Sequence, residues 1–187
     1  DSMNILARPE TALHHSELPQ GEPSDAPHPV PLPETQSKLI YMRFLTLNTH
    51  SWCEIHQIDK IRTIAQFIVD QQVDVIALQE VNQLTSTPVV EHPLHFRGGA
   101  GIPVREDNYA LLLVRALEAL GARYEWTLTE AHLGWERYDE CVAVLSRMPI
   151  RGIRPIDMSP DYTYFQVQRR AAQAALIETP SGPFWCA

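Results

Sequence analysis

Apolar residues recur along the chain in a strand–helix–strand order. Residues 40–48 read as a buried strand, with Ile40, Phe44, Leu45 and Leu47 as its apolar positions. Residues 57–72 carry apolar residues at 3.6-residue spacing, which predicts one inward helical face made of Ile58, Ile61, Ile64/Ala65 and Ile68. Residues 73–78 are almost continuously apolar, as is typical of a strand covered on both faces. The order predicts a β-α-β unit.

The pattern changes after residue 82. Residues 82–105 are polar and rich in Pro and Gly, which predicts a long loop. Asp107 is placed to cap a second helix that ends at Leu120, before Gly121. The inward positions of this helix are predicted to be Ala110, Leu113, Leu117 and Leu120. Further strands are predicted at residues 124–129, 141–146, 172–179 and from 184 onward, with a hairpin turn at 180–182.

The N-terminal segment differs in composition from the rest. Residues 1–37 hold seven of the fifteen prolines and no apolar periodicity, so we expect residues 1–41 to be a disordered Pro-rich tail and residues 42–187 to be the domain. The tail holds two basic and six acidic residues, and the domain holds thirteen and seventeen. The domain is therefore only mildly acidic. It lacks the basic stripe that duplex binding normally needs, which argues against nucleic acid and favours a small phosphorylated substrate.

Bulk properties narrow the class of protein further. A hydrophobic content of 44% is ample for a core. No apolar run reaches the about 18 residues that span a bilayer, and the first forty residues show no signal peptide, so no membrane association is expected. The three cysteines, Cys53, Cys141 and Cys186, show no paired metal spacing. We interpret them as reduced thiols of a cytoplasmic protein.

Two oxygen-bearing side chains follow the first two predicted strands. Asn48 ends the run FLTLN, and Glu80 ends the run DVIALQE. An amide and a carboxylate at one sheet rim would suit Mg²⁺ or Mn²⁺ together with a phosphate. Taken singly, Asn48 reads better as a turn residue and Glu80 as a solvated strand end. Their occurrence as a pair, separated by one helix, favours a site.

At this pairing the sequence resembles the endonuclease/exonuclease/phosphatase family, which has the deoxyribonuclease-I-like fold. The resemblance rests on LTLNTHSW, DVIALQEVN, YDECVAVLSRMPI and QRRAAQAALIET. It implies a four-layered α/β sandwich of two facing mixed sheets with helices outside. It also implies that Asn48 helps to bind phosphate and metal and that Glu80 ligates a divalent cation. The closest resemblance is to bacterial sugar-phosphate phosphatases that dephosphorylate a phosphorylated maltose.

The resemblance assigns further residues. Glu140 matches a carboxylate that orients a catalytic histidine, and Tyr138 is expected near the substrate; solvated hairpin residues are an equal alternative for Asp139 and Glu140. An arginine that contacts the substrate phosphate falls on Arg169 or Arg170, and the alignment favours Arg169. Among the histidines, His132 is retained as a substrate contact, whereas the others read as loop residues.

Trp52 and Trp135 could stack on a sugar or a base, although packing in the protein is the commoner role of such residues.

The family completes its site with a histidine, a Gly-Asp-x-Asn segment and an Asp-His pair, and none of these occurs before Ala187. We therefore expect the N-terminal half of the domain, incomplete at the C-terminus, with the missing half as a partner. The expected activity is Mg²⁺-dependent hydrolysis of a phosphorylated sugar. A nuclease or lipid phosphodiesterase of the same family, or a catalytically silent fragment, remains the alternative.

Overall fold

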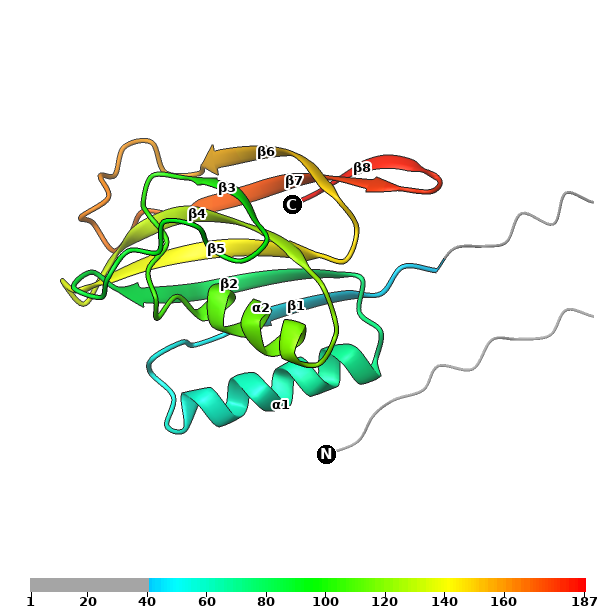
Figure 1. The fold of residues 1–187 in the computed structure, drawn as a ribbon. Coiled ribbons are helices and arrows are strands. Elements are labelled where there is room, and N and C mark those ends of the chain that lie inside the picture. Colours follow the sequence, from blue (N-terminus) through cyan, green and yellow to red (C-terminus); the bar gives the residue numbers. More distant parts are fainter. Residues whose placement is uncertain (1–40) are drawn as a thin grey trace, which may run out of the picture. The chain divides into compact units, whose positions relative to one another are not determined.

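A computed structural model describes residues 41–187 of the chain. The predicted tail, apart from Tyr41, lies outside the described residues, as does Ile40 of the first predicted strand. Figure 1 shows the elements in chain order: β1 (Phe44–Asn48), α1 (Gln57–Asp70), β2 (Val75–Leu84), β3 (Phe96–Ala100), α2 (Tyr109–Ala119), β4 (Glu125–Gly134), β5 (Tyr138–Ser146), β6 (Ile150–Asp157), β7 (Ala171–Thr179) and β8 (Gly182–Cys186).

The strands form two sheets. The larger sheet has the order β1-β2-β5-β4-β3, with β1 parallel to β2, β3 parallel to β4, and β5 antiparallel to both of its neighbours. The parallel pair β1 and β2, joined through α1, is the β-α-β unit that the sequence predicts. The smaller sheet has the order β6-β7-β8 and is antiparallel throughout. Its β7–β8 connection is the hairpin predicted at residues 180–182.

The two faces of the larger sheet are buried by different partners, because successive strand side chains point to opposite faces. Ala143 and Leu145 of β5 pack in one cluster with residues of α1 and α2. Val144, between them, packs against Ala175 and Ile177 of β7 in a second cluster. The mixed α/β architecture with two facing sheets is thus confirmed. In the part of the chain that the structure describes, both helices cover the larger sheet and none covers the outer face of the smaller one.

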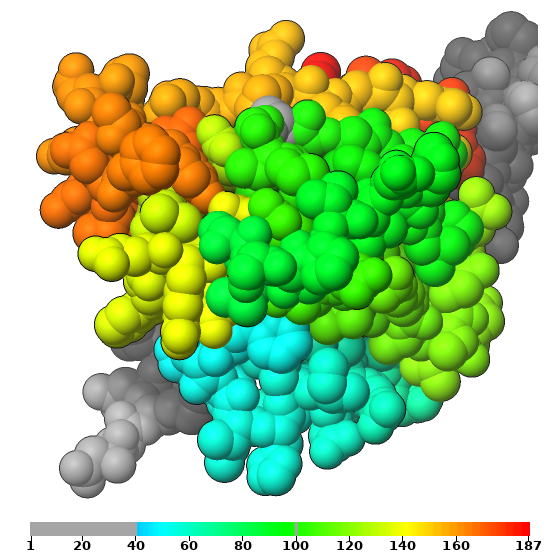
Figure 2. All heavy atoms as spheres, turned by 60° about the vertical axis from the view of Figure 1, so that its left-hand side comes forward, coloured from blue at the N-terminus to red at the C-terminus, as the bar shows by residue number. Residues whose placement is uncertain are grey.

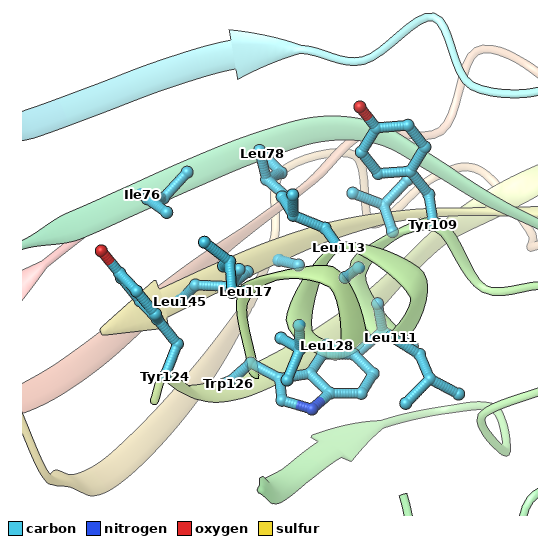
Figure 3. Close-up of a cluster of buried hydrophobic side chains, with 14 of the residues drawn as sticks. Ile76, Leu78, Tyr109, Leu111, Leu113, Leu117, Tyr124, Trp126, Leu128 and Leu145 are labelled. Carbon is cyan, nitrogen blue, oxygen red and sulfur yellow. The ribbon is translucent and has the colours of Figure 1, made fainter. Parts of the chain in front are cut away.

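The main core lies between the helices and the larger sheet (Figure 3), where ten large side chains interlock: Ile76, Leu78, Tyr109, Leu111, Leu113, Leu117, Tyr124, Trp126, Leu128 and Leu145. On α1, Ile61, Ala65 and Ile68 are buried as the spacing predicts. The prediction is wrong for Ile58 in the first turn of α1 and for Leu120 at the end of α2, which are both 43% exposed. At Leu120 the reason is that the chain turns away through Gly121, whose φ is +77°.

Two local predictions are corrected by tertiary contacts. The α2 cap is Asn108, whose side chain accepts from the Leu111 N–H at 3.1 Å, because the Asp107 carboxylate accepts from Leu84 N–H instead. Part of the predicted loop forms β3, which pairs with β4 despite its glycines. At Gly99 a Cβ would collide with the Leu128 carbonyl, so the close strand approach requires glycine there.

None of the helices within residues 41–187 is both long enough and apolar enough to cross a membrane.

Candidate functional site

Glu80 lies at a β-bulge inside β2 rather than past the end of its strand. The register between β2 and β5 passes from Leu78↔Ala143 to Val81↔Cys141, so Gln79 and Glu80 together face one residue of β5. Glu80 has φ +53°, a left-handed conformation that is uncommon for a residue with a side chain. A bulge of this kind bends the strand and redirects a side chain. The prediction of a strand-end glutamate is therefore corrected: the strand continues to Leu84, and the bulge aims the carboxylate.

The loop after β1 satisfies the backbone groups that the bulge leaves unpaired. Thr49 donates its N–H to Gln79 O at 2.9 Å and its hydroxyl to Glu80 O at 2.7 Å. Ser51 accepts from the Asn82 N–H at 2.9 Å. Buried backbone groups need such partners, so this loop fixes the bulge. Sequence reasoning missed Thr49 and Ser51, although short hydroxyl residues directly after a strand are known to bond neighbouring backbone.

The structure brings Asn48 and Glu80 together, as the sequence predicts. Asn48 is the last residue of β1, and its amide donates to Glu80 Oε1 at 2.7 Å. The amide oxygen of Asn48 accepts from the His50 N–H at 2.9 Å, which holds the amide in place. An amide and a carboxylate thus share one end of the β1–β2 pair.

A second bulge places His132 opposite Glu140. Between the pairs Glu130↔Cys141 and His132↔Glu140, β4 contains the extra residue Ala131. His132 therefore points to the same face as Glu140 of β5, with Nε2 3.6 Å from Glu140 Oε1. Both residues lie in strands. His132 is 3% exposed, and Glu140 is half-buried. The alternative of a solvated hairpin thus does not describe Glu140.

These side chains line one pocket of about 260 Å³, and its lining residues come from five strands or from positions next to them. Its polar lining consists of Asn48, Gln79, Glu80, His132, Glu140 and Arg170. Glu80 and Glu140 lie on β2 and β5, which are neighbours in the larger sheet, while Arg170 comes from the residue before β7. The two sheets therefore meet at a polar cavity with two carboxylates, two amides, one imidazole and one guanidinium group.

Of the two candidate arginines, Arg170 lines this pocket and Arg169 does not. The Arg169 guanidinium donates to the Ala131 carbonyl at 2.6 Å and lies 3.4 Å from Asp157 and 3.7 Å from Glu130. These partners hold the Arg169 guanidinium, which is not part of the pocket lining. Tyr138 is also absent from the lining, and its ring lies under the Arg137 guanidinium at 5.1 Å.

Asp139 points to the opposite face of β5 from Glu140 and is almost fully buried. Its carboxylate accepts from Gln83 Nε2 at 2.9 Å, lies 3.5 Å from Arg105 Nε, and accepts from the Tyr164 hydroxyl. These partners come from β2, from the loop before α2 and from the loop before β7. Asp139 is thus a structural junction, not the solvated residue of the alternative interpretation. Trp52 is likewise structural, since its indole N–H donates to two backbone carbonyls.

The pocket suits a shared cation better than a closed metal cage. Across residues 41–187, no three His, Cys, Asp or Glu side chains are grouped so that they could hold a metal by themselves. Mg²⁺, however, keeps several waters and is usually bound by one or two carboxylates plus substrate phosphate oxygens. Glu80, fixed by Asn48, fits that mode of binding.

Burial and the neighbouring charge of Glu80 raise the pKa of the Glu140 carboxyl. Burial also lowers the pKa of His132 and favours its neutral form. The folded protein therefore binds the Glu140 proton more tightly than the unfolded chain, and wild-type stability falls as pH rises from the ordinary glutamate range through the raised pKa.

We expect Glu140→Gln to raise the unfolding midpoint at neutral pH, because the variant keeps the shape of the side chain and removes this unfavourable charge. The gain should shrink as the pH is lowered below the ordinary glutamate range, where both states of the wild type are protonated. Thermal unfolding with EDTA, across a pH series, measures this difference. A gain that is the same at every pH would contradict the assignment of the effect to this carboxyl.

Comparison with known proteins points to one fold. No protein-family model matches the chain, and no curated protein matches its sequence. Among solved structures, an endonuclease/exonuclease/phosphatase family protein from Leptotrichia buccalis C-1013-b matches with a TM-score of 0.67 and 29% identity over 79% of this chain and 53% of that one. An endonuclease/exonuclease/phosphatase from Beutenbergia cavernae DSM 12333 matches with a TM-score of 0.50 and 20% identity over 77% of this chain and 36% of that one.

The chain thus spans about half the length of the first of these proteins. Its structural neighbours are endonuclease/exonuclease/phosphatase family proteins, and the described residues have the α/β fold of that family.

Proposed function

We propose that this chain belongs to the endonuclease/exonuclease/phosphatase family and is a divalent-metal-dependent phosphoric ester hydrolase that acts on a phosphorylated sugar. The observation that carries this proposal is the convergence of Asn48, Glu80, His132, Glu140 and Arg170 in one pocket. These side chains span more than a hundred residues of sequence and meet only through the fold that the neighbours share.

Each side chain has a role that its chemistry supports. Glu80, oriented by Asn48, would hold Mg²⁺ or Mn²⁺. Such an ion, when bound, supplies charge neutralisation for the phosphoryl group. Arg170 carries a planar fork of donors suited to phosphate, and we assign the phosphate contact to it in place of Arg169.

Glu140 and His132 are the proton-handling groups of the pocket. A carboxyl whose pKa is raised by burial and a neighbouring carboxylate accepts a proton more effectively than an ordinary glutamate. Nε2 of neutral His132 lies 3.6 Å from Glu140 Oε1, while its Nδ1 atom is buried. We therefore assign the acid–base role to Glu140 and a positioning and substrate-binding role to His132.

Charge favours a small substrate over nucleic acid. Residues 42–187 hold thirteen Lys or Arg residues and seventeen acidic residues, and Arg170 is the one Lys or Arg among the pocket-lining residues that the structure describes. A duplex is normally bound by several cations that neutralise successive phosphates. One guanidinium suits a single phosphate group.

The purified chain with Mg²⁺ tests this proposal directly. We expect inorganic phosphate to be released from glucose 6-phosphate and maltose 6'-phosphate, no nicking of supercoiled plasmid, and loss of phosphate release when EDTA removes the ion. Nicking without phosphate release would instead identify a nuclease. Absence of both activities would contradict the proposal for this chain and support a catalytically silent one.

A further inference from the structure

The tip of the β4–β5 hairpin presents an aromatic ring to solvent. Trp135 is 81% exposed, and the Arg137 N–H donates to Gly134 O at 3.1 Å to close the turn. Trp135 and Glu136 have φ values of +51° and +59°. Positive φ at both central positions defines a type I′ turn.

Trp135 does not serve the stability of this turn. Type I′ turns favour Asn-Gly or Asp-Gly, because these residues tolerate positive φ, whereas a bulky residue there is an outlier. The ring also adds little to the core, since most of its surface is in water. A strained backbone at an exposed aromatic residue points to a role outside folding.

A second exposed aromatic residue lies on a loop that is bound to the same hairpin. Phe165, in the segment 158–170 between β6 and β7, is 76% exposed. The neighbouring Tyr164 accepts from the Leu133 N–H at 2.8 Å through its carbonyl, and its hydroxyl donates to Asp139. Figure 2 shows this segment (orange) against the hairpin (yellow). The two exposed rings thus stand on two connected segments.

The same two segments reach the phosphate pocket. The hairpin contributes His132 and Glu140 to the pocket, and the loop ends at Arg170. Trp135 follows His132 by three residues, which corresponds to about 10 Å along an extended chain. Both rings therefore stand on segments that also supply side chains to the pocket.

We propose that Trp135 and Phe165 form a sugar-binding rim that holds the ring of the substrate beside the phosphate pocket. The proposal rests on the proposed phosphatase function and assigns the residues that would contact the sugar ring of its substrate. Exposed aromatic faces beside a polar pocket supply apolar contact area, while the pocket groups fix orientation.

Local charge favours a sugar over a polyanion or an anionic membrane. Residues 130–140 and 157–170 together hold six carboxylates, at Glu130, Glu136, Asp139, Glu140, Asp157 and Asp161, against three arginines. Asp139 is buried beside Arg105, and Glu130 and Asp157 lie beside Arg169, so these segments have no surplus of positive charge with which to attract a nucleic acid backbone or anionic lipid headgroups. A sugar ring is uncharged and needs no such surplus.

Saturation-transfer NMR with maltose alone tests the rim without requiring turnover. Maltose should receive saturation from the wild type, and Trp135→Ala or Phe165→Ala should weaken its binding by about 3- to 10-fold. Trp135→Asn should weaken binding similarly while raising the thermal unfolding midpoint, because Asn suits the turn. Phe67→Ala, which removes a 51% exposed ring from α1, is the matched control and should bind maltose normally.

Steady-state kinetics distinguish a role in sugar binding from a role in catalysis. The rim variants should raise KM for glucose 6-phosphate and leave kcat, and all constants for glycerol phosphate, unchanged. A wild type that binds maltose but releases no phosphate would contradict the proposed function and leave the rim supported. Equal maltose binding by all variants, or no maltose binding by the wild type, would overturn the rim. So would loss of binding to phosphatidylserine vesicles or to an oligonucleotide without loss of maltose binding.

Discussion

Replacing Glu80 with glutamine should lower kcat/KM for glucose 6-phosphate by about 100- to 1,000-fold. Glutamine keeps an oxygen that can accept from the Asn48 amide, which the wild-type carboxylate contacts at 2.7 Å, so the bulge and the pocket should keep their shape. A neutral amide, however, cannot offset the charge of a divalent cation and a phosphate. Steady-state phosphate release in saturating Mg²⁺ measures the loss.

The matched control for this substitution is Glu178→Gln. Glu178 is half-exposed on β7 and pairs with Arg151 at 2.6 Å, away from the pocket lining. An exposed ion pair contributes little to stability, so this variant should retain wild-type rates. Equal rates in Glu80→Gln and wild type, with the Mg²⁺ dependence preserved, would remove Glu80 from the site.

Replacing Asp139 with alanine should lower the free energy of unfolding by about 3–5 kcal/mol. The side chains of Asp139 and Arg105 are 6% and 19% exposed, so the substitution leaves a buried guanidinium without its carboxylate. Gln83 and Tyr164 lose their acceptor at the same time. Chemical denaturation of both proteins measures the difference.

Asp161→Ala provides the comparison for Asp139, since Asp161 is an exposed carboxylate in the loop that carries Tyr164. A surface substitution of this kind should change stability by less than about 0.5 kcal/mol. If Asp139→Ala lowers the free energy of unfolding by no more than Asp161→Ala does, the buried contacts of Asp139 contribute no more than a solvated charge. Because the junction also holds the loop before Arg170, Asp139→Ala should weaken phosphate binding as well.

The elements that sequence predicts well are those whose apolar pattern is uninterrupted. The β-α-β unit follows from apolar runs on both sides of an amphipathic helix, and the meeting of Asn48 and Glu80 follows from the parallel pairing of β1 with β2, which ends at Asn48 and Gln79. The α/β class is confirmed for the same reason. The apolar periodicity is sufficient to predict a helix or strand where no distant contact changes the local backbone.

The corrected features depend on contacts that periodicity does not encode. The run LQEVNQL looks like a strand end because four of its seven residues are polar, yet the strand continues, since Thr49 and Ser51 bond the backbone groups around the bulge. By residue type, Asp107 and Asn108 are equally good N-caps, but the Asp107 carboxylate accepts from the Leu84 N–H and is therefore not the cap. Neighbouring arginines differ only in which partners face them. In each case, contacts with residues distant in the sequence determine which of two locally possible conformations or contacts forms.

Electron paramagnetic resonance of Mn²⁺ in the wild type and in Glu80→Gln tests whether Asn48 and Glu80 together position a divalent cation in the pocket that contains Arg170. We expect saturable binding by the wild type and by Glu178→Gln, tightened by inorganic phosphate, and its loss in Glu80→Gln. Undiminished Mn²⁺ affinity in Glu80→Gln would contradict this role of Glu80.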